Sequence, residues 1–375
     1  MGAAALALAP AASARLLARA AFLPNDTGTT TADAPPGGWA TVQWELNGPF
    51  GINAPQAWSQ ASSLGGSGGA GVTIAVLDSG VAYADRGPYR RSPDLARARF
   101  VKGHDFVDDD PYPNDEFGHG TFVASTIAAS ANNAYGTVGV AYHSRIMPLR
   151  VLDFEGRGYP STIARGIRYA VTHGADIINL SLELYDAPPA PPIPRSVRAA
   201  LADARSAGVL VVAASGNSFD PRVPSKRYDT LALNVGGTTE HGCLGSYSNH
   251  GPGVDVVAPG GGADANLPDD ANCQPTLPAG RDISGVSFPT GEPRNFEILP
   301  RFRGTSTAAP HVAGVAALII ASGVLGKHPT PAAIERHIEN TARDLGPIGH
   351  DRFYGAGLVD ATAATQPLAV PTPSG

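Results

Sequence analysis

Residues 72–78 read VTIAVLD, a short apolar run rich in β-branched residues that ends in one aspartate. Such a run is typical of a strand that is buried on both faces of a sheet. Three similar runs follow it: DIINLSL at 176–182, VLVVAAS at 209–215 and TLALNVGG at 230–237. We expect these four runs to be neighbouring strands of one sheet.

Helical patterns lie between these runs. Segments 121–130, 161–174 and 196–208 have helical patterns, and the last two end in glycine, a common helix stop. Strands that alternate with helices indicate a parallel sheet covered on both faces. The sequence therefore predicts an α/β, three-layer fold with a mostly parallel central sheet and helices on both of its faces.

Composition narrows the classes of function. The chain has 375 residues, 43% of them hydrophobic, which is enough for one large domain with a core. A net charge of −6 gives no electrostatic support to a nucleic-acid partner. No apolar run approaches the roughly 18–20 residues of a membrane span, so we expect none. The totals fit a loop-rich globular enzyme.

The ends of the chain differ from its middle. Residues 1–22 are Ala-rich, but they lack the basic start and long apolar core of a signal peptide, so we interpret them as a leader or propeptide remnant. Residues 23–370 form the main domain, and residues 371–375 form a tail.

Polar residues stand just after the predicted strands, where sites form in parallel sheets. Asp78 ends the first run, Ser181 lies near the end of the second, and Asn217 follows the third. His119 lies between two glycines at the start of a predicted helix. We expect these side chains to gather at one edge of the sheet.

Residues 303–319, RGTSTAAPHVAGVAALI, predict an apolar helix whose first turn carries two threonines and a serine. Ser306 opens it, where backbone N–H groups and the positive end of the helix dipole favour a developing oxyanion. Pro310 has no N–H, so the carbonyl near Ser306 loses its helical partner. A serine becomes nucleophilic when a histidine takes its proton and a carboxylate orients the histidine, and Ser306, His119 and Asp78 supply these groups.

Each of these residues alone also has an ordinary interpretation as a cap or turn residue. The longer motifs are more specific. VLDSG with Asp78, GHGTFVAS with His119 and GTSTAAPHVAG with Ser306 resemble the three active-site motifs of the subtilisin-like serine proteases, or subtilases, in that family's order. INAPQAW, SYSNHGPGVDVVAPG and YGAGLVDA are similar to further family segments, and the resemblance extends from about residue 23 to 365.

The resemblance implies a serine endopeptidase of the thermitase-like branch, with the main domain as its peptidase domain. Asp78 would orient His119, His119 would be the general base, and Ser306 would attack the peptide carbonyl to form an acyl-enzyme. Asn217 matches the family's oxyanion donor. Residues that match the family's substrate edges and pocket wall are Gly156, Arg157, Gly158, Ser181, Leu182, Glu183, Ala214, Ser215 and Gly216.

The resemblance also implies structural calcium, as one or two ions. Carboxylate and amide oxygens suit Ca²⁺. One candidate set precedes His119 and the other matches a family site that ties down the N-terminal arm. The first set is Asp105, Asp108, Asp110 and Asn114, and the second is Asp26, Asp94 and Asn133. A plain acidic loop is the alternative for the first set.

The chain has two cysteines, Cys243 and Cys273, both in loop-like sequence. A disulfide between them is the favoured interpretation and two separate thiols the alternative. A secreted, extracellular location fits both this pairing and the resemblance. We expect a monomer that acts on polypeptides.

Three positions depart from the family pattern. Thr307 stands where a methionine usually follows the nucleophile, and Phe122 replaces a common histidine. Glu183 stands at the rim of the substrate pocket, where it either favours basic substrate side chains or is simply solvated. The Pro-rich segment 186–194 is interpreted as an insert beside the same rim.

Two other functions remain open. The chain could be a subtilase-fold protein that binds peptides without cleaving them, or a maturation protease with one narrow substrate. A lipase or esterase would need a G-x-S-x-G elbow and a Ser–Asp–His order, whereas Ser306 lies in GTSTA.

Overall fold

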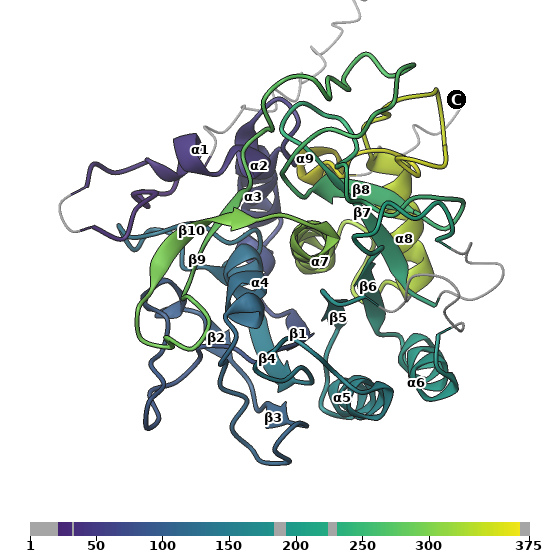
Figure 1. Ribbon diagram of the computed structural model, residues 1–375. Helices are drawn as coiled ribbons and strands as arrows, with labels where there is room; N and C mark the ends of the chain where they lie inside the picture. Colours follow the sequence, from purple (N-terminus) through teal and green to yellow (C-terminus); the bar gives the residue numbers. More distant parts are fainter. Residues whose placement is uncertain (1–21, 32–33, 184–192, 224–230, 368–375) are drawn as a thin grey trace, which may run out of the picture.

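The computed structural model of the chain describes residues 22–31, 34–183, 193–223 and 231–367 (Figure 1). The predicted leader, apart from Phe22, and the predicted tail 371–375 lie outside these residues. Most of the predicted Pro-rich insert also lies outside them.

A parallel sheet forms the centre of the fold. Its strands follow the order β2–β4–β1–β5–β6–β7–β8, with β3 paired to β4, and every neighbouring pair is parallel. The strands are β1 (Thr73–Asp78), β2 (Arg99–Phe100), β3 (His104–Asp105), β4 (Arg145–Arg150), β5 (Ile177–Leu180), β6 (Leu210–Ala214), β7 (Leu233–Thr238) and β8 (Val256–Pro259). The four predicted runs are β1, β5, β6 and β7.

Helices cover both faces of the sheet (Figure 1). The α-helices are α1 (Trp39–Val42), α2 (Trp44–Asn47), α3 (Ala54–Ser63), α4 (His119–Ala128), α5 (Pro160–Thr172), α6 (Arg195–Ser206), α7 (Thr305–Ser322), α8 (Pro331–Thr341) and α9 (Ala361–Ala364). Short 3₁₀ turns lie at Ser67–Gly69 and Pro93–Leu95. Glycines follow α5 and α6 in the left-handed conformation, Gly174 at φ +78° and Gly208 at φ +81°, as their predicted stops require.

Alternate residues of β1 divide the core into two layers. Ile74 and Val76 pack in a cluster with α3, α4 and α7, whereas Ala75 and Leu77 pack in a second cluster with α5 and α6. This alternation is the two-residue period of a strand that is buried on both faces. The predicted three-layer α/β fold is therefore confirmed.

Helix α7 lies at the centre of the first layer and contacts β5, β6, β7 and β8 (Figure 1). Among the described residues it is the helix whose length and composition would suit a membrane span, but 83% of it is buried inside the fold. Its apolar residues therefore serve the core, and its first turn reaches the carboxyl edge of the sheet.

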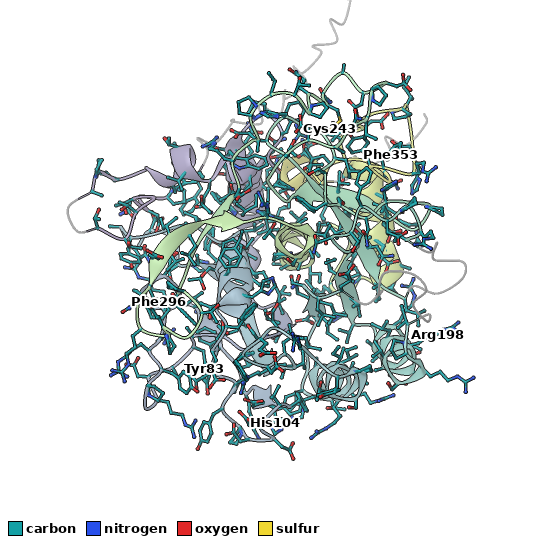
Figure 2. The ribbon with its side chains drawn as sticks, viewed as in Figure 1. Tyr83, His104, Arg198, Cys243, Phe296 and Phe353 are labelled. Carbon is teal, nitrogen blue, oxygen red and sulfur yellow. A yellow bond between two sulfur atoms is a disulfide. The ribbon has the colours of Figure 1, made fainter. Side chains whose placement is uncertain are left out.

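Two further features flank this core. An antiparallel hairpin of β9 (Ile283–Ser287) and β10 (Glu297–Phe302) packs on α4 and leads directly into α7. A disulfide joins Cys243 to Cys273, in a small apolar cluster that includes Phe353. Figure 2 places Cys243 and Phe353 at the same end of the molecule, opposite His104.

Candidate active site

Asp78 and His119 meet at the carboxyl edge of the sheet. Asp78 is the last residue of β1 and is fully buried, and His119 is the first residue of α4. His119 Nδ1 lies 2.8 Å from Asp78 Oδ1 and 3.0 Å from Oδ2. Because Nδ1–H donates to this carboxylate, Nε2 is the nitrogen that is left to accept a proton.

A second buried carboxylate holds the start of α4. Asp115 accepts hydrogen bonds from the backbone N–H groups of Gly118 (2.9 Å) and Thr121 (2.9 Å). It also accepts one from Ser79 Oγ at 2.9 Å, directly after Asp78 in the chain. Asp115 therefore ties the end of β1 to the turn that carries His119. The sequence reasoning missed this residue, although an acidic residue just before a helix is a recognisable capping signal.

The charge around His119 favours its protonated form. Burial of the ring opposes protonation, but the charge and hydrogen bond of Asp78, with the charge of Asp115, outweigh it. The pKa of His119 is therefore raised above its ordinary value of 6.5. A raised pKa suits a base that must hold a proton during one step and release it in the next.

Ser306 is the second residue of α7, and its carbonyl has an unusual partner. Pro310 lies four residues further along and offers no N–H to Ser306 O. Ser181 Oγ donates to this carbonyl at 2.7 Å instead, and it accepts a hydrogen bond from Asn179 Nδ2 at 2.9 Å. The end of β5 thus supplies the donor that the helix lacks, and it holds the first turn of α7 at the site.

The side chain of Asn217 has a fixed orientation. Its Oδ1 accepts hydrogen bonds from Thr305 N at 2.8 Å and from Thr305 Oγ1 at 3.1 Å. Asn217 Nδ2 has no acceptor among the described residues, so it is the donor that the amide can offer to a bound molecule. Asn217 and Ser306 both line the pocket described next, so this donor belongs to the same site as the serine. The sequence reasoning missed Thr305, whose role depends on a contact made only in the folded chain.

A pocket of about 210 Å³ unites the predicted residues. It is lined by Phe117, His119, Leu152, Gly156, Ser181, Leu182, Glu183, Ala214, Gly216, Asn217 and Ser306. Three predicted substrate residues do not line it. Arg157 extends into solvent and pairs with Glu155. Gly158 packs so close to Leu152 that a Cβ on it would lie 2.7 Å from the Leu152 side chain. Ser215 is fully buried, and its Oγ donates to Asn249 O.

Phe117 and Leu152 line the pocket but were not predicted. Phe117 stands two residues before His119, and Leu152 follows the end of β4. Leu152 follows the rule that sites form just beyond the carboxyl ends of strands, but β4 itself was not among the predicted strands.

Glu183 lies directly against Gly216, which we call the floor of the pocket. A Cβ atom on Gly216 would be 2.5 Å from Glu183 Oε1 and 2.2 Å from Asn249 Nδ2. Gly216 also has φ +104°, which a residue with a side chain rarely adopts. Glycine is therefore required at this position, and the Glu183 carboxylate closes one side of the pocket.

The second predicted calcium set comes together where Asp26 of the N-terminal arm meets the body of the fold. Asp26 and Asp94 are fully buried, and both bond to the loop around Asn133. Burial, together with the charge of Asp26, raises the pKa of Asp94 to about 7. In the described part of the chain neither carboxylate forms a salt bridge, and a Cβ on Gly136 would lie 2.7 Å from the Asp94 carboxylate. Two buried carboxylates in so close a cradle fit a cation.

The acidic loop before His119 has a different partner. Arg150, at the end of β4, donates to Asp105 Oδ2 at 2.8 Å and to Asp108 Oδ2 at 2.6 Å. Asp110 Oδ1 accepts from a backbone N–H within the loop, and Asn114 Oδ1 is buried with no partner among the described residues. A guanidinium therefore takes two of the four predicted ligands, which weakens the prediction of calcium here.

The departures at Thr307 and Phe122 both turn out to be buried. Thr307 Oγ1 donates to Gly304 O at 2.8 Å, inside the first turn of α7. Phe122 stacks on Phe302 of β10, with ring centroids 3.9 Å apart, and Phe302 also lies 6.3 Å from the His119 ring. The hairpin thus packs against the helix that carries His119.

The sequence of the chain is similar to those of known proteins. The model of the peptidase S8, or subtilase, family matches residues 69–357. The chain is 37% identical over 320 residues to subtilisin BL of Lederbergia lenta, which covers 85% of this chain and 98% of that protein. It is 34% identical over 320 residues to thermitase of Thermoactinomyces vulgaris, covering 85% and 95%.

A solved structure extends the likeness to three dimensions. A protease of Pseudoalteromonas arctica superposes with a TM-score of 0.69 at 30% identity, covering 92% of this chain and 99% of that one. The family match spans more than half of the chain, and it includes the strand that ends at Asp78, the helix that begins at His119 and the helix that carries Ser306. The chain therefore belongs to the subtilase family of serine endopeptidases.

Proposed function

We propose that the protein cleaves peptide bonds with Ser306 as nucleophile, His119 as general base and Asp78 as the residue that orients the base. The observation that carries this proposal is the contact between His119 Nδ1 and Asp78, at a pocket that His119 shares with Ser306. A serine, a histidine and a buried carboxylate in this relation are the parts that activate a hydroxyl.

In the first half of the reaction, Ser306 Oγ attacks the peptide carbonyl carbon while His119 Nε2 takes the hydroxyl proton. The oxyanion accepts hydrogen bonds from Asn217 Nδ2 and from the Ser306 backbone N–H, which lies in the first turn of α7 and so has no partner within the helix. The C–N bond then breaks, His119 protonates the departing amine, and the acyl group stays on Ser306. Water repeats the attack with the same base and releases the acid.

The substrate chain binds as an added strand between two edges of the pocket. Gly156 would form one edge, and Ser181 and Leu182 would form the other; the support for this is that all three line the pocket. The side chain before the cut enters the pocket against Ala214 and Gly216, with Glu183 beside it.

One structural calcium ion would bind at Asp26, Asp94 and Asn133. The ion would neutralise the two buried carboxylates and join the N-terminal arm to the body. Thermal unfolding of the inactive Ser306→Ala protein tests this without self-digestion. Calcium should raise the midpoint temperature of unfolding and EDTA should lower it, whereas Asp94→Asn should remove the difference between the two conditions. Equal midpoint temperatures with calcium and with EDTA would contradict the site.

We also propose that the protein is secreted. The disulfide between Cys243 and Cys273 supports an oxidising compartment, since disulfides are rare in the cytosol.

Labelling with a fluorophosphonate serine probe tests the proposed mechanism. The wild-type protein should be labelled, whereas Ser306→Ala and His119→Ala should not. A folded wild-type protein that resists labelling would instead support a peptide-binding protein without activity. A labelled protein that cleaves one peptide out of a diverse peptide library would support a dedicated maturation protease.

A further inference from the structure

Asn249 lies outside the reacting groups, yet it holds the loop that carries one of them. It stands between β7 and β8 and is 4% exposed. It lies in the family-like segment SYSNHGPGVDVVAPG, but neither the three active-site motifs nor the pocket lining includes it. Its contacts connect two parts of the site.

The first part is the loop 215–220, which contains Asn217. Asn249 Oδ1 accepts hydrogen bonds from the backbone N–H groups of Ser218 and Asp220, both at 2.9 Å. Asn249 Nδ2 donates to Ser215 O at 3.0 Å, and the Asn249 backbone N–H donates to Gly216 O at 2.9 Å. One amide side chain thus bonds to the backbone on both sides of Asn217.

The second part is the side of the pocket that Glu183 forms. Asn249 Nδ2 lies 3.4 Å from Glu183 Oε1, so it also contacts the carboxylate beside the pocket floor. Gly216 leaves the space for this contact, because a Cβ there would lie 2.2 Å from Asn249 Nδ2. Few side chains could replace that of Asn249, since this position needs a hydrogen-bond acceptor and a donor on one planar group.

We propose that Asn249 is a positioning residue for the oxyanion hole. Thr305 fixes the Asn217 side chain from the α7 side, and Asn249 fixes the Asn217 backbone from the other side. Together they keep Asn217 Nδ2 where the oxyanion forms. The inference rests on the proposed peptidase mechanism, in which Asn217 stabilises the oxyanion.

Truncation of Asn249 should therefore slow the chemical step more than it weakens substrate binding. Loss of an oxyanion donor lowers kcat by about 10²–10³, and misplacement of the donor should forfeit part of this. We expect Asn249→Ala to lower kcat by about 10- to 50-fold with little change in KM. It should also weaken binding of a peptide aldehyde, whose adduct with the serine carries the oxyanion, by a similar factor.

A double-mutant cycle with Asn217→Ala separates this role from general damage to the fold. If Asn249 acts through Asn217, then Asn249→Ala should lower kcat by less than about 3-fold once Asn217 is already alanine. If the two losses multiply in full, the proposal is overturned. Asn249→Ser completes the same cycle if the alanine variant does not fold.

Asn234→Ala is the matched control. Asn234 is equally buried, and its Nδ2 donates to Gly253 O at 2.9 Å, away from the loop 215–220. This variant should lose stability but keep kcat. If Asn249→Ala has the same kcat as Asn234→Ala, Asn249 has no positioning role. A folded but inactive wild-type protein would overturn the peptidase mechanism as well, so the two failures can be told apart.

Discussion

The hydrogen bond from Ser181 Oγ to Ser306 O predicts that Pro310→Ala should compensate for the loss caused by Ser181→Ala. Ser181→Ala removes this donor and also leaves Asn179 Nδ2 without its acceptor. A buried polar group without a partner destabilises a protein by about 1–3 kcal/mol. Since the Ser306 carbonyl is only partly buried, we expect a loss of about 1–2 kcal/mol in the free energy of unfolding. Activity should fall too, because the turn that holds Ser306 is no longer fixed.

Pro310→Ala should reverse much of this loss. It restores a backbone N–H four residues after Ser306, in the position that bonds to Ser306 O in a regular helix. In the Ser181→Ala background, the new N–H replaces the missing hydroxyl. We expect a coupling free energy of about 1 kcal/mol between the two substitutions, with partial recovery of kcat/KM in the double variant.

Urea unfolding of the four proteins of this cycle, all in the Ser306→Ala background to prevent self-digestion, measures the coupling. Ser322→Ala serves as the control, because Ser322 Oγ donates to Ile319 O at the far end of the same helix. It should not couple to Pro310→Ala. Additive effects of Ser181→Ala and Pro310→Ala, within about 0.5 kcal/mol, would refute the view that Ser181 replaces the donor that proline removes.

Three further predictions concern His119 and two residues near it in the site, Thr307 and Glu183. Because the pKa of His119 is raised, the base becomes neutral only above pH 6.5, and kcat/KM should rise with pH through a midpoint above 6.5. Asp78→Asn should lower kcat by about 10³–10⁴ and move this midpoint down. A midpoint at or below pH 6.5 in the wild-type protein would contradict the assignment of His119 as the base. Dilute peroxide should leave activity intact, because Thr307 stands in place of an oxidisable methionine and Met147 is fully buried. Thr307→Met should make the enzyme sensitive to peroxide. Rapid inactivation of the wild-type protein would count against this explanation. Glu183→Gln should reduce the preference for Lys or Arg over Phe or Leu before the cleaved bond by about 2- to 5-fold, as expected for an exposed charge pair. An unchanged ratio of kcat/KM for the two classes of peptide would indicate that Glu183 is simply solvated.

The four strands that could be predicted from the sequence lie in short, mostly apolar runs, whereas the four-residue strand β8 (VVAP) was not predicted. β1, β5, β6 and β7 have this form because both of their faces are buried. β4 was missed because its six residues include Pro148 and begin and end with arginine. Arg150 belongs to the strand but turns its guanidinium to the acidic loop, so a fold-specific ion pair hides the strand pattern.

The roles of Asp78, His119 and Ser306 stay predictions, but the residues themselves could be named from the sequence, since each lies in a short motif at the end of a strand or the start of a helix. Their supports could not. Thr305 and Asn249 act through side-chain contacts to segments about 90 and 30 residues away in the chain, and no local pattern encodes such a distance. The prediction of calcium at Asp105, Asp108, Asp110 and Asn114 stays a prediction; it was made without Arg150, which folding brings to Asp105 and Asp108.

The crowding around Gly216 also limits how this enzyme could acquire a new preference. In many pockets the simplest route to a narrower specificity is a side chain on the floor. Here any such side chain would collide with Asn249 and Glu183 and would need a strained backbone. Natural variation and laboratory evolution would therefore have to reshape the walls, at Leu182 or Ala214, while the floor stays fixed.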